Sequence, residues 1–210
     1  NAGNLKEGIP TPSFGSVQPG DVKYSDLDNN GVVDQNDVTQ IGKSVYPEWY
    51  YSFGGKIGFK GFDLEGLFQG AAGASVNLLD NWNQTVAFVN NGNAYEIAKG
   101  AWAYYPTEGI DTRATARYPR LTTQSNENNY QTSSMWIKSA DYLKLRNLEL
   151  GYNFNTVKLQ KAGIENLRIY LSGHNLATFS GLLKHYNLDP ERISGYPTVR
   201  SYNVGVSITF

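Results

Sequence analysis

The sequence predicts an all-β protein built from long antiparallel strands. Apolar and polar residues alternate in five segments of about ten residues each, which is the period of a strand with two different faces. Short links and long connections alternate between these segments. The length of 210 residues is that of one large domain or two small ones.

Residues 1–47 are predicted to be loop, because proline and glycine interrupt them and no helical period can be traced. From Glu48 onward, residues 51–59 and 62–69 alternate across the link Lys60-Gly61 and predict a β-hairpin. The polar stretch 72–135 is too long for an ordinary connection, and residues 94–103 within it favour one short helix.

Three further strands are expected over residues 143–154, 167–172 and 202–210. The alternation of the first slips by one residue near Arg146-Asn147, which indicates a β-bulge. Residues 156–163 favour a short helical turn that Asn155 or Thr156 would cap and Gly163 would end.

The five strands have unequal connections. The links at 60–61 and 155–165 are short and fall at one end of an antiparallel sheet, whereas 72–135 and 178–199 are long and fall at the other. This asymmetry is typical of an outer-membrane β-barrel, with short periplasmic turns and long outer loops. A soluble β-sandwich also alternates and remains the alternative at this point.

The composition of the two strand faces suits the barrel. Aromatic residues stand near the strand ends on the apolar face, as interfacial girdles require: Tyr51, Phe59, Tyr152, Phe154 and Phe210. The opposite face carries groups that tolerate a wet lumen: Lys56, Asp63, Glu65, Gln69, Lys144, Arg168 and Ser172. Five strands cannot close around a lumen, so we expect the chain to be part of a longer protein, and its lack of a signal segment agrees with this.

Composition excludes several functions. A net charge of −1 argues against nucleic acid as a partner, and zero cysteines exclude disulfides, thiolate zinc sites and cysteine catalysis. No nucleophile–base–acid constellation stands out, so we do not expect an enzyme. The carboxylates of Asp63 and Glu65 share one strand face, where they are expected to tune a lumen.

Residues 26–37 match the spacing D-x-D-x-N-G-x-V-D-x-x-D, which is that of calcium loops. The predicted ligands are the side chains at positions 1, 3, 5, 9 and 12 and the carbonyl at position 7: Asp26, Asp28, Asn30, Asp34, Asp37 and Val32. Gly31 would permit the sharp turn. We expect a structural Ca²⁺; the alternative is a solvated turn without metal.

Four aromatic residues in the long stretch could stack on sugar rings: Trp82, Trp102, Tyr104 and Tyr105. Packing of the loop is the competing interpretation, and it is favoured. If the chain were a sandwich, these features would instead predict a secreted, calcium-stabilised carbohydrate-binding module.

Several blocks resemble the SusC/RagA-type TonB-dependent transporters of Bacteroidota. They occur in the family's order over nearly the whole chain: Pro19-Gly-Asp-Val-Lys-Tyr24 through Asp37, Tyr51-Ser-Phe-Gly-Gly55, Lys60-Gly-Phe-Asp-Leu64, Tyr142-Leu-Lys-Leu-Arg-Asn-Leu-Glu-Leu-Gly-Tyr152, Leu167 to Leu176, Tyr196-Pro197 and Tyr202 to Phe210.

The resemblance implies the C-terminal strands of a barrel of about 22 strands in the outer membrane. It also implies import of glycans, or of oligopeptides, under a SusD-like lipoprotein lid with energy from TonB–ExbBD. The plug and the remaining barrel would lie outside this chain, and the barrel-assembly machinery would bind Phe210. If Phe210 is periplasmic, residues 1–47, 72–135 and 178–199 are extracellular.

Overall fold

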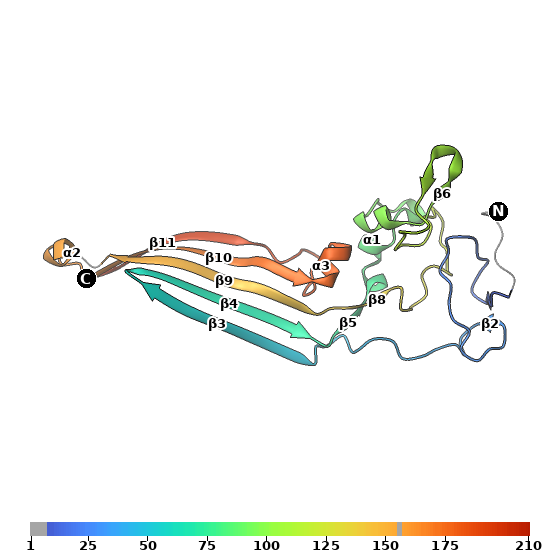
Figure 1. Cartoon of the computed structure of the whole chain (residues 1–210), viewed down its shortest axis with the longest axis horizontal. Coiled ribbons are helices and arrows are strands. Elements are labelled where there is room, and N and C mark those ends of the chain that lie inside the picture. The colour runs from blue at the N-terminus through green and yellow to red at the C-terminus, as the bar shows by residue number, and fades with distance from the viewer. Residues whose placement is uncertain (1–7, 155–156) are drawn as a thin grey trace. The chain divides into compact units, whose positions relative to one another are not determined.

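The computed structural model describes residues 8–154 and 157–210 (Figure 1). It divides into two compact units. The sheet unit comprises residues 44–75, 139–184 and 188–210; the loop unit comprises the described part of 1–43 together with 76–138 and 185–187. Among the described residues, no helix has both the length and the apolar character needed to cross a membrane.

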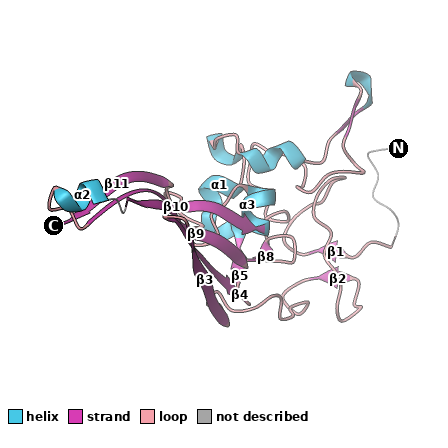
Figure 2. Cartoon of the chain, turned by 60° about the vertical axis from the view of Figure 1, so that its left-hand side comes forward, coloured by secondary structure: helices cyan, strands magenta, loops and turns pink. Residues whose placement is uncertain are grey.

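The sheet unit is built on five antiparallel strands in the order β11-β10-β9-β4-β3 (Figure 2). They are β3 (Trp49–Phe59), β4 (Phe62–Ala72), β9 (Tyr142–Phe154), β10 (Asn166–Ser180) and β11 (Ser201–Thr209). The five predicted segments are therefore confirmed as one antiparallel sheet. The sheet is open, with β3 and β11 at its edges, so a closed barrel is not formed by this chain alone.

The predicted hairpin between β3 and β4 is confirmed. Phe59 pairs with Phe62 across the two-residue turn, and Lys60 and Gly61 both have positive φ, at 49° and 89°. Positive φ at both central positions matches the turn to the right-handed strand twist.

The predicted β-bulge lies at Arg146. Leu67 of β4 pairs with Asn147, but the next residue, Phe68, pairs with Leu145, which leaves Arg146 as the extra residue. Because of this insertion, Leu145 and Leu148 both stay on the apolar side of β9.

Two short helices border β10. Helix α2 (Val157–Lys161) lies in the predicted turn, followed by Gly163 at φ +77°; the proposed caps Asn155 and Thr156 lie outside the described residues. Helix α3 (Gly181–Tyr186) follows β10.

The expected loop 178–199 was placed too early, because pairing with β9 resumes after the bulge and carries β10 to Ser180. Ala72 likewise belongs to β4 rather than to the following loop.

The long stretch after β4 is folded. Its short elements are β5 (Ser75–Asn77), η1 (Leu78–Asn81), α1 (Trp82–Thr85), η2 (Val89–Asn91), η3 (Glu96–Gly100), β6 (Tyr104–Tyr105), η4 (Pro106–Glu108), β7 (Ile110–Asp111) and β8 (Ile137–Ser139). The helix expected over residues 94–103 is only the 3₁₀ turn η3. It ends at Gly100 because Ala101 is extended and forms a bridge with Tyr118.

The loop unit has its own core. Leu78, Val86, Ala87, Tyr118 and Trp136 are almost completely buried. The described residues before Lys43 are loop-like, as predicted, apart from the two-residue strands β1 (Thr11–Pro12) and β2 (Val32–Val33), which pair in parallel.

Candidate functional site

One face of the sheet, here called the apolar face, consists of the side chains that strand register aligns in rows. They include Phe53, Ile57, Phe59, Phe62, Leu64, Phe68, Leu148, Leu150, Tyr152, Ile169, Leu171, Val204, Val206 and Ile208. Many are exposed: Phe53 by 56%, Leu171 by 52% and Val204 by 77%. So large a continuous apolar surface requires an apolar environment outside this chain.

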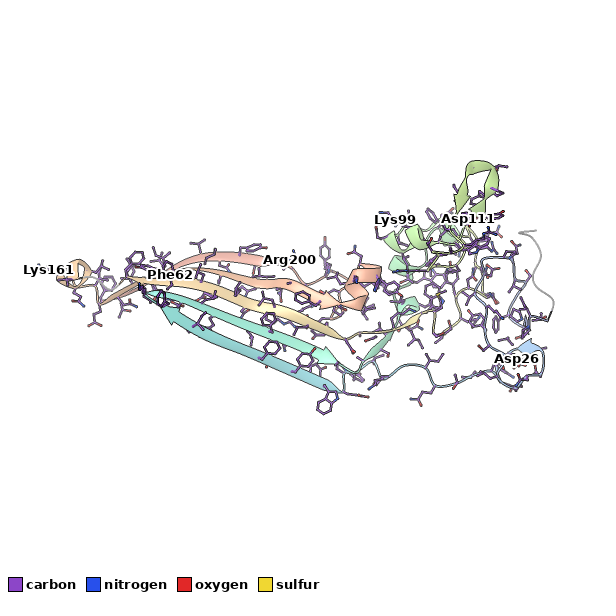
Figure 3. All side chains as sticks on the ribbon, viewed as in Figure 1. Asp26, Phe62, Lys99, Asp111, Lys161 and Arg200 are labelled. Atoms are coloured by element: carbon purple, nitrogen blue, oxygen red, sulfur yellow. The ribbon has the colours of Figure 1, made fainter. Side chains whose placement is uncertain are left out.

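Phe62 lies where the β3–β4 hairpin ends this face (Figure 3), and other aromatic residues lie around it. Phe62 pairs in register with Tyr152, their rings lie 4.6 Å apart, and the ring of Phe154 lies 4.6 Å from that of Tyr152. Phe210, 81% exposed, follows β11 at the same end, because Thr209 pairs with Asn166. Tyr51 lies toward the other end of β3. The predicted concentration of aromatic residues at the strand ends is confirmed.

The opposite face, here called the polar face, is connected by ion pairs across strands. Arg168 of β10 binds Asp63 of β4 at 2.5 Å and Glu149 of β9 at 2.7 Å, and Lys56 of β3 lies 3.4 Å from Asp63. Glu65 lies 3.6 Å from Lys56. Asp63 is therefore a paired structural carboxylate, and nothing in this arrangement favours acid–base chemistry with Glu65.

A second charged cluster near the start of β9 was not predicted as a unit. The Lys144 side chain is only 1% exposed, and its Nζ lies 2.8 Å from Asp189 and 2.6 Å from Glu191. Arg146 also pairs with Glu191 and donates a 2.8 Å hydrogen bond to Gln69. The alternating Tyr142, Lys144 and Arg146 are visible in the sequence, but their partners are more than 40 residues away.

The acidic loop of residues 26–37 brings together three of the predicted ligands. Carboxylate oxygens of Asp26, Asp28 and Asp37 lie within 4.8 Å of one another. Gly31 has φ +86°, which gives the sharp turn expected there. Backbone N–H groups of Asp34 and Leu27 donate to Asp37 and hold the pKa of that carboxyl below its usual range.

The other predicted ligands are placed differently. The Asp34 carboxylate caps the Asn36 N–H at 2.7 Å and is not one of the three converging carboxylates. The Asn30 side-chain oxygen accepts from the Val32 N–H at 2.8 Å. Ca²⁺ prefers oxygen ligands, and three carboxylates converge here. The residues therefore fit a hard cation.

The four aromatic residues predicted to contact substrate have separate surroundings: Trp82, Trp102, Tyr104 and Tyr105. The ring of Trp82 meets that of Tyr130 edge to face at 5.2 Å. Tyr104 lies under the Arg113 guanidinium at 3.8 Å. Tyr105 is exposed. Trp102 packs closely against Gly20. Three of the four aromatic residues thus have a packing partner in the loop unit, and substrate contact stays a prediction.

The segment Pro19 to Tyr24 anchors the N-terminal part of the loop unit. The buried Asp21 carboxylate pairs with Arg120 at 2.7 Å and accepts hydrogen bonds from Asn126 and Asn129. Gly20 has φ +92°, and a Cβ there would overlap the Trp102 ring.

Two tyrosines complete this core. The Tyr24 hydroxyl donates to the Asn128 carbonyl, and burial raises the pKa of Tyr24 to about 12. Burial also raises the pKa of Tyr118, whose hydroxyl donates to the Thr85 carbonyl. These groups line or adjoin a cavity of about 1260 Å³ in the loop unit, whose wall also contains Trp102, Arg113 and Asp37.

The sequence was compared with protein families and with curated proteins. No protein-family model matches the sequence. The chain is 29% identical over 227 aligned residues to TonB-dependent receptor P3 of Formosa agariphila, covering 99% of this chain and 21% of the relative. The chain is similar to TonB-dependent receptors. TonB-dependent receptor P26 of the same organism is 25% identical over 91% of this chain and 20% of its own length.

Solved structures agree in fold. The RagAB peptide transporter superposes with a TM-score of 0.63 at 24% identity, covering 91% of this chain and 20% of that chain. The RagAB peptide importer in its open-open state gives a TM-score of 0.61 at 22% identity, over 89% of this chain and 20% of that chain. The chain therefore spans about a fifth of the length of the TonB-dependent receptors and RagAB chains that it matches. Their names describe receptors and importers, in agreement with the expectation of a non-enzyme.

Proposed function

We propose that this chain forms C-terminal barrel strands of a TonB-dependent outer-membrane importer. The exposed apolar face carries the proposal. Its strands of 9 to 15 residues are long enough for a tilted strand to cross the hydrocarbon core, which takes about 9–11 residues. Similarity to TonB-dependent receptors over nearly the whole chain supports the same function.

The two free edges of the sheet are explained by the rest of the same barrel. β3 and β11 each have one side without a neighbouring strand among the described residues. An exposed strand edge of this length is a hazard for aggregation, and a closed barrel removes it. We therefore assign the missing neighbours to the remaining strands of a barrel of about 22, with the plug inside it.

Partners and cargo follow from the family. A SusD-like surface lipoprotein would cover the outer mouth, TonB–ExbBD would supply energy, and glycans or oligopeptides would be the cargo. The RagAB structures are described as those of a peptide importer, which supports import of organic nutrients and an assembly of two components. Residues 1–47, 73–135 and 181–199 would then be extracellular, and Phe210 would be the periplasmic signal for the barrel-assembly machinery in a Gram-negative host.

The acidic loop would hold a structural Ca²⁺. Asp26, Asp28 and Asp37 would be its carboxylate ligands, and Asn30, Val32 and Asp34 would complete the set. Their convergence within 4.8 Å for the three carboxylates supports this assignment. A bound cation would neutralise three acidic groups that otherwise repel one another.

The alternative is a secreted, calcium-stabilised β-sandwich that binds carbohydrate. A sandwich buries its apolar face against a second sheet. In the part of the chain that the structure describes, the five-stranded sheet has no such partner. The exposed apolar face therefore favours the importer.

Fractionation of cells that express the full-length gene product tests this function. We expect a protein about five times longer than this chain that sediments with outer membranes and requires detergent for extraction. Co-purification of a surface lipoprotein would support the proposed lid. A product that is soluble without detergent would contradict the importer and favour the sandwich.

A further inference from the structure

The segment Leu188–Arg200 between α3 and β11 is fixed to the polar face of the sheet by the Lys144 cluster. Lys144 Nζ donates to Asp189 at 2.8 Å and to Glu191 at 2.6 Å. Because the side chains of Lys144 and Asp189 are 1% and 9% exposed, this contact is shielded from water. The Tyr142 hydroxyl adds a 2.7 Å hydrogen bond to Glu191.

Asp189 also connects parts of the segment to one another. Asp189 accepts hydrogen bonds from the backbone N–H of Glu191 at 3.0 Å and of Thr198 at 2.9 Å. Burial raises the pKa of Asp189, but the hydrogen bond from Lys144 and these two backbone bonds outweigh it and hold the pKa at about 2. Asp189 therefore joins the two ends of the segment while Lys144 holds it against β9.

The β-bulge supplies the second attachment. As the extra residue of β9, Arg146 reaches the polar face, where it pairs with Glu191 and binds Gln69 of β4. It also donates to Asn175 of β10 at 3.0 Å. Three adjacent strands and the segment thus meet at one guanidinium, which can bind several acceptors in a fixed geometry.

We propose that Lys144 and Arg146 are positioning residues that pin Leu188–Arg200 over the polar face, making it a fixed part of the outer wall of the import path. This inference rests on the proposed function in one respect only, namely that the polar face lines the lumen of the proposed barrel. The pinned segment leaves Tyr196 85% exposed. It thereby presents an exposed aromatic side chain beside the path.

Limited trypsin digestion of the purified full-length transporter in detergent tests the pinning. The segment contains Arg192, and cleavage after an exposed arginine requires local opening of the backbone around it. We expect Lys144→Met to speed cleavage after Arg192 at least about tenfold, because it leaves Asp189 without its cation and Glu191 with Arg146 alone. Asp189→Asn, which keeps the shape of the side chain, should also speed cleavage.

The matched control is Lys56→Met. Lys56 lies on the same polar face and forms ion pairs with Asp63 and Glu65, but its contacts involve no residue of the segment. Cleavage after Arg192 should stay at the wild-type rate in this variant. Equal rates in wild type, Lys56→Met, Lys144→Met and Asp189→Asn would overturn the proposal. If Lys144→Met fails to fold, the rate of cleavage after Arg192 in Asp189→Asn decides: a rate above that of wild type supports the pinning, and an equal rate overturns it.

A second readout separates this inference from the proposed function. Digestion in detergent reports on the pinning whether or not the protein resides in the outer membrane. Addition of trypsin to intact cells reports on the side of the membrane. Pinning in detergent without any outer-membrane location would contradict the importer alone, and an importer with an unpinned segment would contradict this inference alone.

Discussion

The two units of this chain place their apolar residues in opposite ways. The loop unit encloses Trp136, Leu78 and Val86 among its own segments. The sheet unit leaves its apolar residues on the outside and ties its charged residues together on the other face. The loop unit thus follows the rule of a protein surrounded by water, and the sheet unit follows that of a β-barrel surrounded by lipid.

Truncation of the central aromatic residue should have the largest effect, and it should be confined to the loop unit. Trp136 packs against Tyr118 and Tyr130 and donates a 2.8 Å hydrogen bond from its indole to Asn129. Trp136→Ala should lower the free energy of unfolding of this unit by about 3–5 kcal/mol. Proteolysis of the full-length protein, mapped by mass spectrometry, should show new cuts within residues 76–138.

Trp82→Ala is the control, because Trp82 is 40% exposed. Its effect on proteolysis should be clearly smaller. Equal sensitivity of the two variants would contradict an enclosed core around Trp136.

A charge on the apolar face should have the next largest effect. Val204→Arg places a cation in the middle of β11, at a cost of about 2–4 kcal/mol near the centre of a bilayer. We expect strongly reduced amounts of folded protein in the outer membrane, measured by heat-modifiable electrophoretic mobility. The neighbouring Asn203 lies on the polar face, so Asn203→Arg should be tolerated. Equal loss in both variants would contradict the assignment of the two faces.

The sequence predicted the sheet better than the loop unit for a physical reason. Strand alternation is local, so five strands, the Lys60-Gly61 turn and the slip at Arg146 could be recognised from neighbouring residues alone. The contacts of Asp21 with Arg120 and Asn129 join residues about 100 positions apart. No local period marks such contacts, and the fold of residues 76–138 was therefore not predicted.

The candidate sites show the same limit. The spacing of the acidic loop predicted that Asp26, Asp28 and Asp37 would converge, because the ligands lie within 12 residues. It did not predict that Asp34 would cap Asn36 instead of joining the three carboxylates. The partners of Lys144, Asp189 and Glu191, lie in the segment after α3, more than 40 residues away, and no local period marks these contacts.

Removal of calcium should affect the loop unit and spare the sheet unit. A cation at 100 times its dissociation constant stabilises the state that binds it by about 2.7 kcal/mol. A chelator, or Asp37→Asn, should therefore increase proteolysis around residues 26–37. Asp34→Asn should have a smaller effect, because Asp34 lies outside the converging carboxylates. A chelator without effect on the wild-type protein would contradict a bound cation.

Acid should release the pinned segment of the sheet unit, with the smallest of these effects. The Lys144 ammonium and backbone N–H groups lower the pKa of Asp189 to about 2, against an unfolded value of about 3.9. Since the folded pKa is the lower one, the stabilisation is fully present above pH 3.9 and is lost as the pH falls toward 2. Its size is at most about 2–3 kcal/mol.

Urea unfolding of the full-length protein in detergent measures this dependence. Wild type should be more stable than Asp189→Asn at pH 5, and the difference should shrink at pH 2, where the carboxyl is about half protonated in the folded state and almost fully protonated in the unfolded state. The Asp21 carboxylate provides the comparison with the loop unit, because Asp21→Asn should destabilise residues 76–138 and leave Leu188–Arg200 intact. A difference between wild type and Asp189→Asn that stays constant from pH 5 to pH 2 would mean that Asp189 acts through its shape and not through its charge.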